Sequence, residues 1–262
     1  MKRAWMALGL LIFVATGAAA APLRVVATTT IVGDLTRAVA GDRASVTVLL
    51  PASADPHAFD PSPRDAALLA GADLVFINGL GLESFLEPLL DNLGERTGRA
   101  IVSLSDGIAA RHAEEHGHGP GDVEPGEDHA HGDLDPHVWL DPRCLLSWVD
   151  NLERALAERA PAEAPYFAER AAQTRRMLED LDAWVRTRVS SVPADRRLFA
   201  TDHDEFGYFA ERYGFEIVGC IVPSLTTLAE PSARGLADLQ RALAARGARV
   251  IVIGQSANPA LA

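Results

Sequence analysis

Residues 161–192 read PAEAPYFAERAAQTRRMLEDLDAWVRTRVSSV and form the longest helical pattern in the sequence. Apolar or small side chains recur along this stretch at steps of three and four, which places them on one face of a helix. They are Phe167, Ala171, Thr174, Leu178, Leu181, Val185 and Val189. Pro161 lies near the start and Pro193 just past the end, as is typical of helix boundaries. At 1.5 Å per residue the helix is about 40 Å long, so we expect a rigid helix that links two lobes.

Strands and helices alternate on both sides of this helix. Four β-branched or apolar runs precede it and predict strands at 23–28, 46–50, 72–78 and 100–104. Helical patterns lie among and after them, at 31–40, 63–70, 84–92 and 142–159. Beyond the long helix, strands are predicted at 198–201, 215–222 and 250–253, and helices at 205–213 and 231–246. This order predicts an α/β fold with two lobes, each with a mostly parallel sheet.

The domain boundaries follow from this alternation. We expect an N-terminal α/β lobe over 21–160, a linking helix over 161–192 and a C-terminal α/β lobe over 193–262. The second lobe has three predicted strands where the first has four, and the sequence ends nine residues after the last of them. We therefore expect the C-terminal lobe to be incomplete, as in a truncated product.

The first twenty residues have the pattern of an export signal. Lys2 and Arg3 form a positive start, an apolar run extends to Val14, and small residues precede a cleavage point after Ala20. No later stretch approaches the roughly 18 apolar residues that a membrane-spanning helix needs. We therefore expect residues 1–20 to be a cleaved signal peptide and the protein to be periplasmic.

Charge and cysteine content restrict the classes of partner. The 262 residues contain 36 acidic and 24 basic side chains, a net charge of −12. A nucleic acid would be repelled by this charge, and no basic stripe interrupts it, so nucleic acid is excluded and a cation is favoured. Cys144 and Cys220 are too few and too far apart for a zinc–thiolate site. They leave two alternatives, a disulfide in an oxidising compartment or two buried thiols.

Three histidines occupy similar places in the predicted fold. His57 and His137 each lie in an Asp-Pro-His triplet, and His203 follows the first strand of the second lobe in Thr-Asp-His. Ligand sites in α/β sheets lie beyond the carboxyl ends of strands, and imidazole is a common ligand of zinc. An aspartate precedes each histidine by one or two positions and could orient its ring. We predict that the three histidines form one metal site, although any one of them alone would be read as an ordinary loop residue.

Residues 111–135 interrupt the alternation and are predicted to form a mobile loop. The segment is rich in His, Glu, Asp and Gly and has almost no apolar residues. Five of the eight histidines in the chain lie here, at His112, His116, His118, His129 and His131. Clustered histidines with carboxylates bind divalent metals weakly and without fixed geometry. We expect them to act as an auxiliary capture site, the alternative being a solvated acidic linker.

Several motifs of the chain resemble one known family. They are VVATTTIVGD (25–34), DPHAFDPSPRD (55–65), ADLV (72–75), NG (78–79), LE (82–83), DPHVWLDP (135–142) and HDEFGY (203–208). Over residues 23–262 the chain resembles the periplasmic zinc- and manganese-binding proteins of ABC importers, the ZnuA/TroA type, with AztC-like zinc binders as the nearest branch. The resemblance implies metal in a cleft between the lobes, with His57, His137 and His203 as ligands. It also implies that the protein passes the metal to an ABC permease. We further expect a monomer, with a periplasmic metallochaperone as a second partner.

The sequence departs from the family's pattern near its end. Where relatives often read Phe-x-Glu-Pro-Gln, it has Val252-Ile253-Gly254-Gln255, so a common Glu is absent. The sequence also ends before the segment that brings the family's late Asp, the usual source of a fourth, carboxylate ligand. We expect either a truncated product or a site of three histidines and water. Three histidines with an open position also describe catalytic zinc, which keeps an exported zinc hydrolase as an alternative, with Asp202, Asp204 or Glu205 as its base. An adhesin of the same fold is a third class. We expect no enzyme, but a high-affinity carrier of Zn²⁺, with Mn²⁺ or iron as the second candidate because nitrogen-rich ligation favours zinc.

Overall fold

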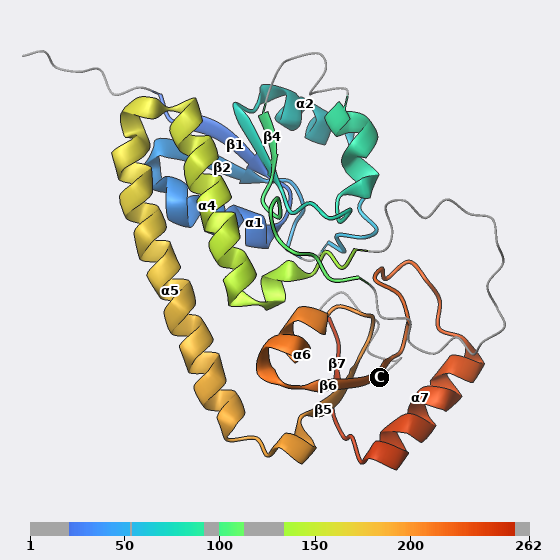
Figure 1. Ribbon diagram of the computed structural model, residues 1–262. Helices are drawn as coiled ribbons and strands as arrows, with labels where there is room; N and C mark the ends of the chain where they lie inside the picture. The colour runs from blue at the N-terminus through green and yellow to red at the C-terminus, as the bar shows by residue number, and fades with distance from the viewer. Residues whose placement is uncertain (1–20, 53, 92–99, 113–133, 255–262) are drawn as a thin grey trace, which may run out of the picture.

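The computed structural model describes residues 21–52, 54–91, 100–112 and 134–254. In this part of the chain two parallel sheets are joined by one long helix, α5 (Ala164–Ser190), which runs along the side of the molecule from one sheet to the other (Figure 1). The predicted α/β fold with two parallel sheets and a long linking helix is confirmed. The predicted signal peptide at 1–20 lies outside the described residues.

The first sheet contains four parallel strands. Their order across the sheet is β2 (Ala44–Val48), β1 (Leu23–Ala27), β3 (Leu74–Ile77) and β4 (Ala100–Ser103). The strand expected at 46–50 begins and ends two residues earlier, although Leu49 and Leu50 still donate hydrogen bonds to the carbonyls of Ala27 and Thr28. Since all four strands run the same way, their carboxyl ends lie at one edge of the sheet, where ligand sites of such sheets are found.

Helices cover both faces of this sheet. They are α1 (Thr30–Ala40), α2 (Pro63–Gly71) and α4 (Pro142–Arg159), together with the first half of α5. Val25 and Phe76 pack into the large core beside α1, α4 and α5, whereas their neighbours Val26 and Val75 pack into a second core with α2. Side chains of a strand alternate between its two faces, so a strand covered on both sides reads as a continuous apolar run.

The long helix is buried along only half of its length. The stripe predicted over 167–189 is buried as far as Leu178, beyond which Leu181 is 43% exposed and Trp184 is 56% exposed. The predicted apolar stripe is thus covered mainly along its first half, because α1 and α4 pack against that half of the helix. The helix also starts three residues late, after the short 3-10 turn η4 (Pro161–Glu163).

The C-terminal part of the chain contains a smaller parallel sheet with two helices beside it. The second sheet has the parallel order β6 (Glu216–Cys220), β5 (Leu198–Thr201), β7 (Ile251–Val252). Around it lie η5 (Ala194–Arg196), α6 (Gly207–Tyr213) and α7 (Ala233–Arg246). In the N-terminal part the remaining 3-10 turns are η1 (Gly41–Arg43), η2 (Ser84–Leu86) and η3 (Val138–Leu140). The helix expected at 205–213 begins only at Gly207, so residues 202–206 form a loop at the carboxyl end of β5.

The two cysteines are free thiols. Cys144 is half-buried in α4, and Cys220 is buried at the end of β6, where its sulfur lies 3.2 Å from the Thr201 hydroxyl oxygen. Burial raises the pKa of Cys220 to about 12 and that of Cys144 to about 11. Of the two alternatives for the cysteines, the structure has the buried thiols. Within the residues that the structure describes, no helix has the length and hydropathy needed to cross a bilayer.

Candidate metal centre

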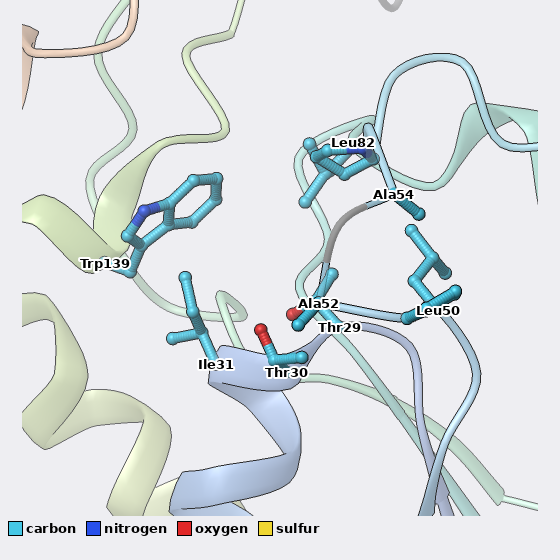
Figure 2. Close-up of a pocket in the computed structure, with 10 residues that line it drawn as sticks. Thr29, Thr30, Ile31, Leu50, Ala52, Ala54, Leu82 and Trp139 are labelled. Carbon is cyan, nitrogen blue, oxygen red and sulfur yellow. The ribbon is translucent and has the colours of Figure 1, made fainter. Parts of the chain in front are cut away.

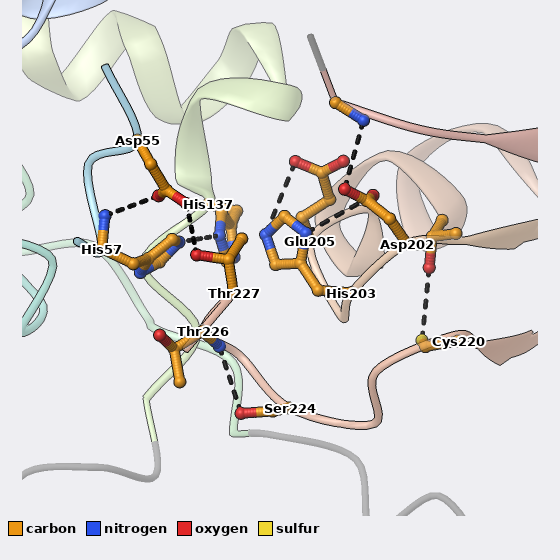
Figure 3. A network of polar contacts seen from close by, with 12 residues as sticks. Asp55, His57, His137, Asp202, His203, Glu205, Cys220, Ser224, Thr226 and Thr227 are labelled. Carbon is orange, nitrogen blue, oxygen red and sulfur yellow. Dashed lines mark hydrogen bonds and ion pairs between the residues drawn. The ribbon is translucent and has the colours of Figure 1, made fainter. Parts of the chain in front are cut away.

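The three predicted ligand histidines meet between the two sheets. His57 lies in the loop after β2, His137 directly precedes η3, and His203 follows β5 by two residues (Figure 3). One ring nitrogen from each lies within 4.8 Å of those of the other two. The ring centroids of the three pairs are 5.4, 5.6 and 5.2 Å apart. Side chains separated by up to 146 positions are thus brought to one point by the two α/β units.

One pair of ring nitrogens, from His57 and His137, has a spacing suited to a metal. Nε2 of His57 and Nε2 of His137 are 3.3 Å apart. In a tetrahedral zinc site with Zn–N bonds of about 2.0–2.1 Å, neighbouring ligand atoms are about 3.3 Å apart. Two neutral imidazole lone pairs repel each other at this distance unless a proton or a cation lies between them. The pair therefore fits a shared divalent cation.

His137 is the most constrained of the three histidines. Its side chain is 1% exposed, and Asp135 Oδ1 accepts hydrogen bonds from its backbone N–H at 2.9 Å and its Nδ1 at 2.8 Å. The Nδ1 bond leaves the Nε2 lone pair free to face a metal, as in carboxylate–histidine–zinc sites. Burial lowers the pKa of His137 against the opposing effect of Asp135, so the ring is neutral and ready to bind a cation.

Asp55 holds His57 through its backbone and not through its ring. Asp55 Oδ1 accepts the His57 N–H at 2.9 Å, while Asp55 Oδ2 accepts a 2.5 Å hydrogen bond from the hydroxyl of Thr227 in the other half of the molecule. Both carboxylate oxygens are thus used away from the His57 ring. Burial and the neighbouring imidazoles His137 and His203 lower the pKa of His57 to about 4, so its ring is also neutral at ordinary pH.

His203 has carboxylates beside both of its ring nitrogens. Asp202 Oδ1 is 3.4 Å from Nδ1, and Glu205 Oε2 is 3.8 Å from Nε2. Burial works to lower the pKa of His203, but these carboxylates outweigh it and raise the pKa. In the described part of the chain both buried ring nitrogens lack a hydrogen bond of good geometry. A buried ring nitrogen without a well-formed hydrogen bond, close to two other imidazoles, is well suited to bind a metal.

Glu205 adds a carboxylate next to the histidines. Asp202, His203 and Glu205 form a second group whose ligand atoms lie within 4.8 Å of one another. Burial raises the pKa of Glu205 to about 7, against the lowering effect of His203. Sequence reasoning considered Glu205 only as a base for hydrolysis. In the structure it could instead supply an oxygen to a metal that is held by His203.

A buried carboxylate supports the backbone under His137. Glu83 is 4% exposed and accepts hydrogen bonds from the Thr28 hydroxyl and from the backbone N–H groups of Asn78 and Gly79. Asn78 Nδ2 in turn donates to the carbonyl of Pro136 at 3.1 Å. The network ties the ends of β1 and β3 to the residue before His137. Its polar residues in an apolar stretch were visible in the sequence, but their role was not.

The C-terminal part also contacts the Asp135 turn through a tyrosine. The Tyr208 hydroxyl donates to the Asp135 carbonyl at 2.9 Å and accepts from the Arg111 N–H at 3.0 Å. A Cβ added at Gly207 would lie 2.7 Å from the Arg111 guanidinium and 3.1 Å from the Asp135 carboxylate. Gly207 thus allows the start of α6 to approach this turn closely. Tyr208 lies in one of the motifs of the sequence but was given no role there, and Thr227 was not considered.

Of the five predicted capture histidines, the structure describes only His112. His112 is exposed and pairs with Leu134 in an isolated antiparallel bridge at the base of the predicted loop. It belongs to neither of the two groups that could hold a metal among the described residues. His116, His118, His129 and His131 lie outside the described residues.

An apolar hollow of about 210 Å³ borders the centre on the N-terminal side. Figure 2 shows Trp139 on one side of it, Leu82, Ala54 and Leu50 opposite, and Ile31 at its base. The Trp139 ring contacts His137, with centroids 5.2 Å apart. An apolar wall next to the imidazoles keeps the local dielectric low, which strengthens their interaction with a bound cation.

Comparison with known proteins identifies the family of the chain. The family model described as "Zinc-uptake complex component A periplasmic" matches residues 25–262. The manganese-binding lipoprotein MntA of Halalkalibacterium halodurans is 32% identical over 197 residues, which are 75% of this chain and 60% of that protein. The zinc-binding protein TroA of Treponema pallidum is 31% identical over 232 residues, 88% of this chain and 70% of that protein.

Solved structures have the same fold. The periplasmic zinc-binding protein TroA from Treponema pallidum superimposes with a TM-score of 0.76 at 29% identity, over 91% of this chain and 80% of that one. Zn(II)-bound AdcA from Streptococcus pneumoniae gives a TM-score of 0.72 at 28% identity, over 92% of this chain and 48% of that one. The chain thus spans only part of the length of these relatives. The matched family consists of periplasmic or extracellular solute-binding proteins rather than enzymes. The chain belongs to the ZnuA family of metal-binding, solute-binding proteins of ABC importers.

Proposed function

We propose that this protein captures Zn²⁺ in the periplasm with His57, His137 and His203 and delivers it to an ABC-type permease for import. The observation that carries the proposal is the convergence of three ring nitrogens from two separate sheets, with 3.3 Å between Nε2 of His57 and Nε2 of His137. The sequence of residues 1–20, with its positive start and apolar run, supports export through a cleaved signal.

Zinc is the proposed metal because the ligand set is rich in nitrogen. Three neutral imidazoles suit zinc, whereas manganese prefers more carboxylate oxygen. Manganese or iron is the second candidate, and the carboxylates of Asp202 and Glu205 beside His203 favour it. Named relatives of both kinds exist, the manganese-binding MntA and the zinc-binding TroA.

The proposal assigns a role to each part of the chain. Residues 21–160 and 193–262 are two lobes that supply the ligands, and 161–192 links them. The histidine-rich segment 111–135 collects metal weakly and passes it to the centre. The partners are the permease and a periplasmic metallochaperone as donor, and the protein acts as a monomer.

Calorimetric titration with Zn²⁺ and with Mn²⁺, together with measured bound-metal stoichiometry, tests this function. We expect one tight zinc site that is lost in His57→Ala and kept in the control His112→Ala, whose exposed histidine lies outside both metal-binding groups. Weaker sites from the histidine-rich segment remain in both variants. Weak binding that is unchanged in His57→Ala would contradict the proposed centre, and tighter manganese than zinc would favour the second candidate.

A further inference from the structure

The hydrogen bond between Thr227 and Asp55 joins a loop of the C-terminal half to the segment that carries His57. Thr227 lies in the loop between β6 and α7, and Asp55 lies two residues before His57. The hydroxyl donates to Asp55 Oδ2 while Asp55 Oδ1 accepts the His57 N–H. Figure 3 shows Thr227 between His57 and His203, at the border of the two halves.

The loop that carries Thr227 is fixed to the segment that carries His203. The Val222 N–H donates to the Asp202 carbonyl at 2.7 Å, and the Asp204 N–H donates to the Ser224 carbonyl at 2.9 Å. The Ser224 hydroxyl then accepts the Thr226 N–H at 3.2 Å, which shapes the turn just before Thr227. A displacement of the His203 segment is therefore transmitted to Thr227.

The His57 turn has fewer supports of its own than the His137 turn. The His57 ring receives no bond from Asp55, whose two oxygens are both used elsewhere. By contrast, Asp135 bonds the His137 ring, and Asn78 supports the preceding Pro136. Removal of the Thr227 hydroxyl would thus act mainly on His57, which is held less firmly than His137.

We propose that Thr227 is a positioning residue of the metal centre: its hydroxyl ties the His203 segment to the Asp55–His57 turn and so slows release of the bound metal. This inference rests on the proposed function. A hydrogen bond to a carboxylate is among the stronger ones in proteins, and differences of affinity within one site are mostly differences of dissociation rate. The bond closes the site from the side of the C-terminal sheet, and its breakage is a step that allows metal to leave.

The test compares Thr227→Val, which keeps the shape and removes the hydroxyl, with Thr227→Ser, which restores it. The matched control is Thr187→Val, because Thr187 makes a comparable 2.9 Å hydroxyl bond to Ala183 on the exposed side of α5. Zinc is loaded into each full-length protein, and its release to an excess of chelator is followed by stopped flow. We expect release about tenfold faster in Thr227→Val, and rates within about twofold of wild type in the other two.

Two metal-free measurements separate positioning from a structural role. The thermal unfolding midpoint of the metal-free protein should fall no further in Thr227→Val than in the control Thr187→Val, whereas exchange of the His57 amide proton, followed by NMR, should be faster only in Thr227→Val. A wild-type release rate in Thr227→Val overturns the proposal, and so does equally fast release in Thr227→Ser or in Thr187→Val. If wild-type protein retains no zinc, the proposed function fails. In that case exchange of the His57 amide proton in Thr227→Val still tests whether Thr227 positions the His57 turn. An unchanged exchange rate would overturn that role.

Discussion

The two Asp-Pro-His turns have the same sequence and the same backbone bond but different surroundings. In each, the aspartate Oδ1 accepts the histidine N–H at 2.9 Å. At His137 the same oxygen also binds the ring, and the side chain is 1% exposed. At His57 the second aspartate oxygen binds Thr227 of the opposite half, and the ring is only partly buried. A local motif thus determines the turn, while its tertiary neighbours determine how firmly the imidazole is held.

Each turn is also attached to the C-terminal part by one hydroxyl. Tyr208 donates to the backbone carbonyl of Asp135, and Thr227 donates to the carboxylate of Asp55. The Tyr208 side chain is buried at the start of α6, whereas Thr227 lies half-buried in a loop. We infer that the His137 turn is the fixed side of the centre and the His57 turn the adjustable side.

The largest loss of zinc affinity is expected when the imidazole of either turn is removed. His137→Ala is expected to weaken zinc binding about a thousandfold, on the order of 4 kcal/mol, because no other side chain of its turn can replace a buried, oriented ligand. His57→Ala should cost less, since a water molecule can enter on the half-buried side. Competition titration against a chelator of known affinity measures both. Equal losses in the two variants would contradict the distinction between a fixed and an adjustable side.

The next largest loss of zinc affinity is expected when the carboxylate of Asp135, which orients the His137 ring, is removed. Asp135→Ala removes the acceptor of the His137 Nδ1 proton and is expected to weaken zinc binding about 10- to 100-fold, as is usual for groups that orient a metal ligand. NMR of the imidazole nitrogens should show that His137 loses its single tautomer. Asp55→Ala leaves the tautomer of His137 unchanged and serves as the control. A preserved tautomer in Asp135→Ala would show that another group orients the ring.

Lower pH should weaken zinc binding through protonation of His203 rather than of His57 or His137. Metals bind neutral imidazole, so a proton competes with the metal at any ligand whose pKa lies above the pH. The pKa of His57 is lowered to about 4 and that of His137 is also lowered, whereas that of His203 is raised. As the pH falls below the raised pKa of His203, zinc affinity should decrease about tenfold per pH unit. Affinity measured from pH 8 to pH 5.5 checks this, and a constant value down to pH 5.5 would contradict it.

The smallest loss of zinc affinity is expected when Pro56 or Pro136, the proline of either turn, is replaced. Pro56→Ala adds backbone freedom to the turn and is expected to weaken zinc binding about two- to fivefold, from roughly 0.4–1 kcal/mol of chain entropy. Pro136→Ala should have less effect, because Asn78 already holds the Pro136 carbonyl. The two variants are compared by calorimetry under one set of conditions. A larger loss in Pro136→Ala than in Pro56→Ala would reverse the assignment of the adjustable turn.

Much of the fold could be predicted because its signals are local. Apolar strands buried on both faces, helix caps such as Ser62 and Asp141, and the helical spacing of α5 are each set by a few neighbouring residues. The exposure of Leu181 and Trp184 was not predictable in this way, because it depends on where α1 and α4 end against α5. Helical periodicity shows which residues share a face but not whether another element covers it.

The sequence by itself determined the type of fold, the two Asp-Pro-His turns and the three histidines that meet between the sheets, since residue type and spacing carry this information. Only the tertiary structure decided which aspartate bonds a ring, that Glu83 supports the His137 turn, and that Tyr208 and Thr227 attach the two turns to the opposite half. These contacts join residues separated by up to 172 positions. Threonine, tyrosine and glutamate are common residues, and only the packing of the two sheets selects those that face the metal centre.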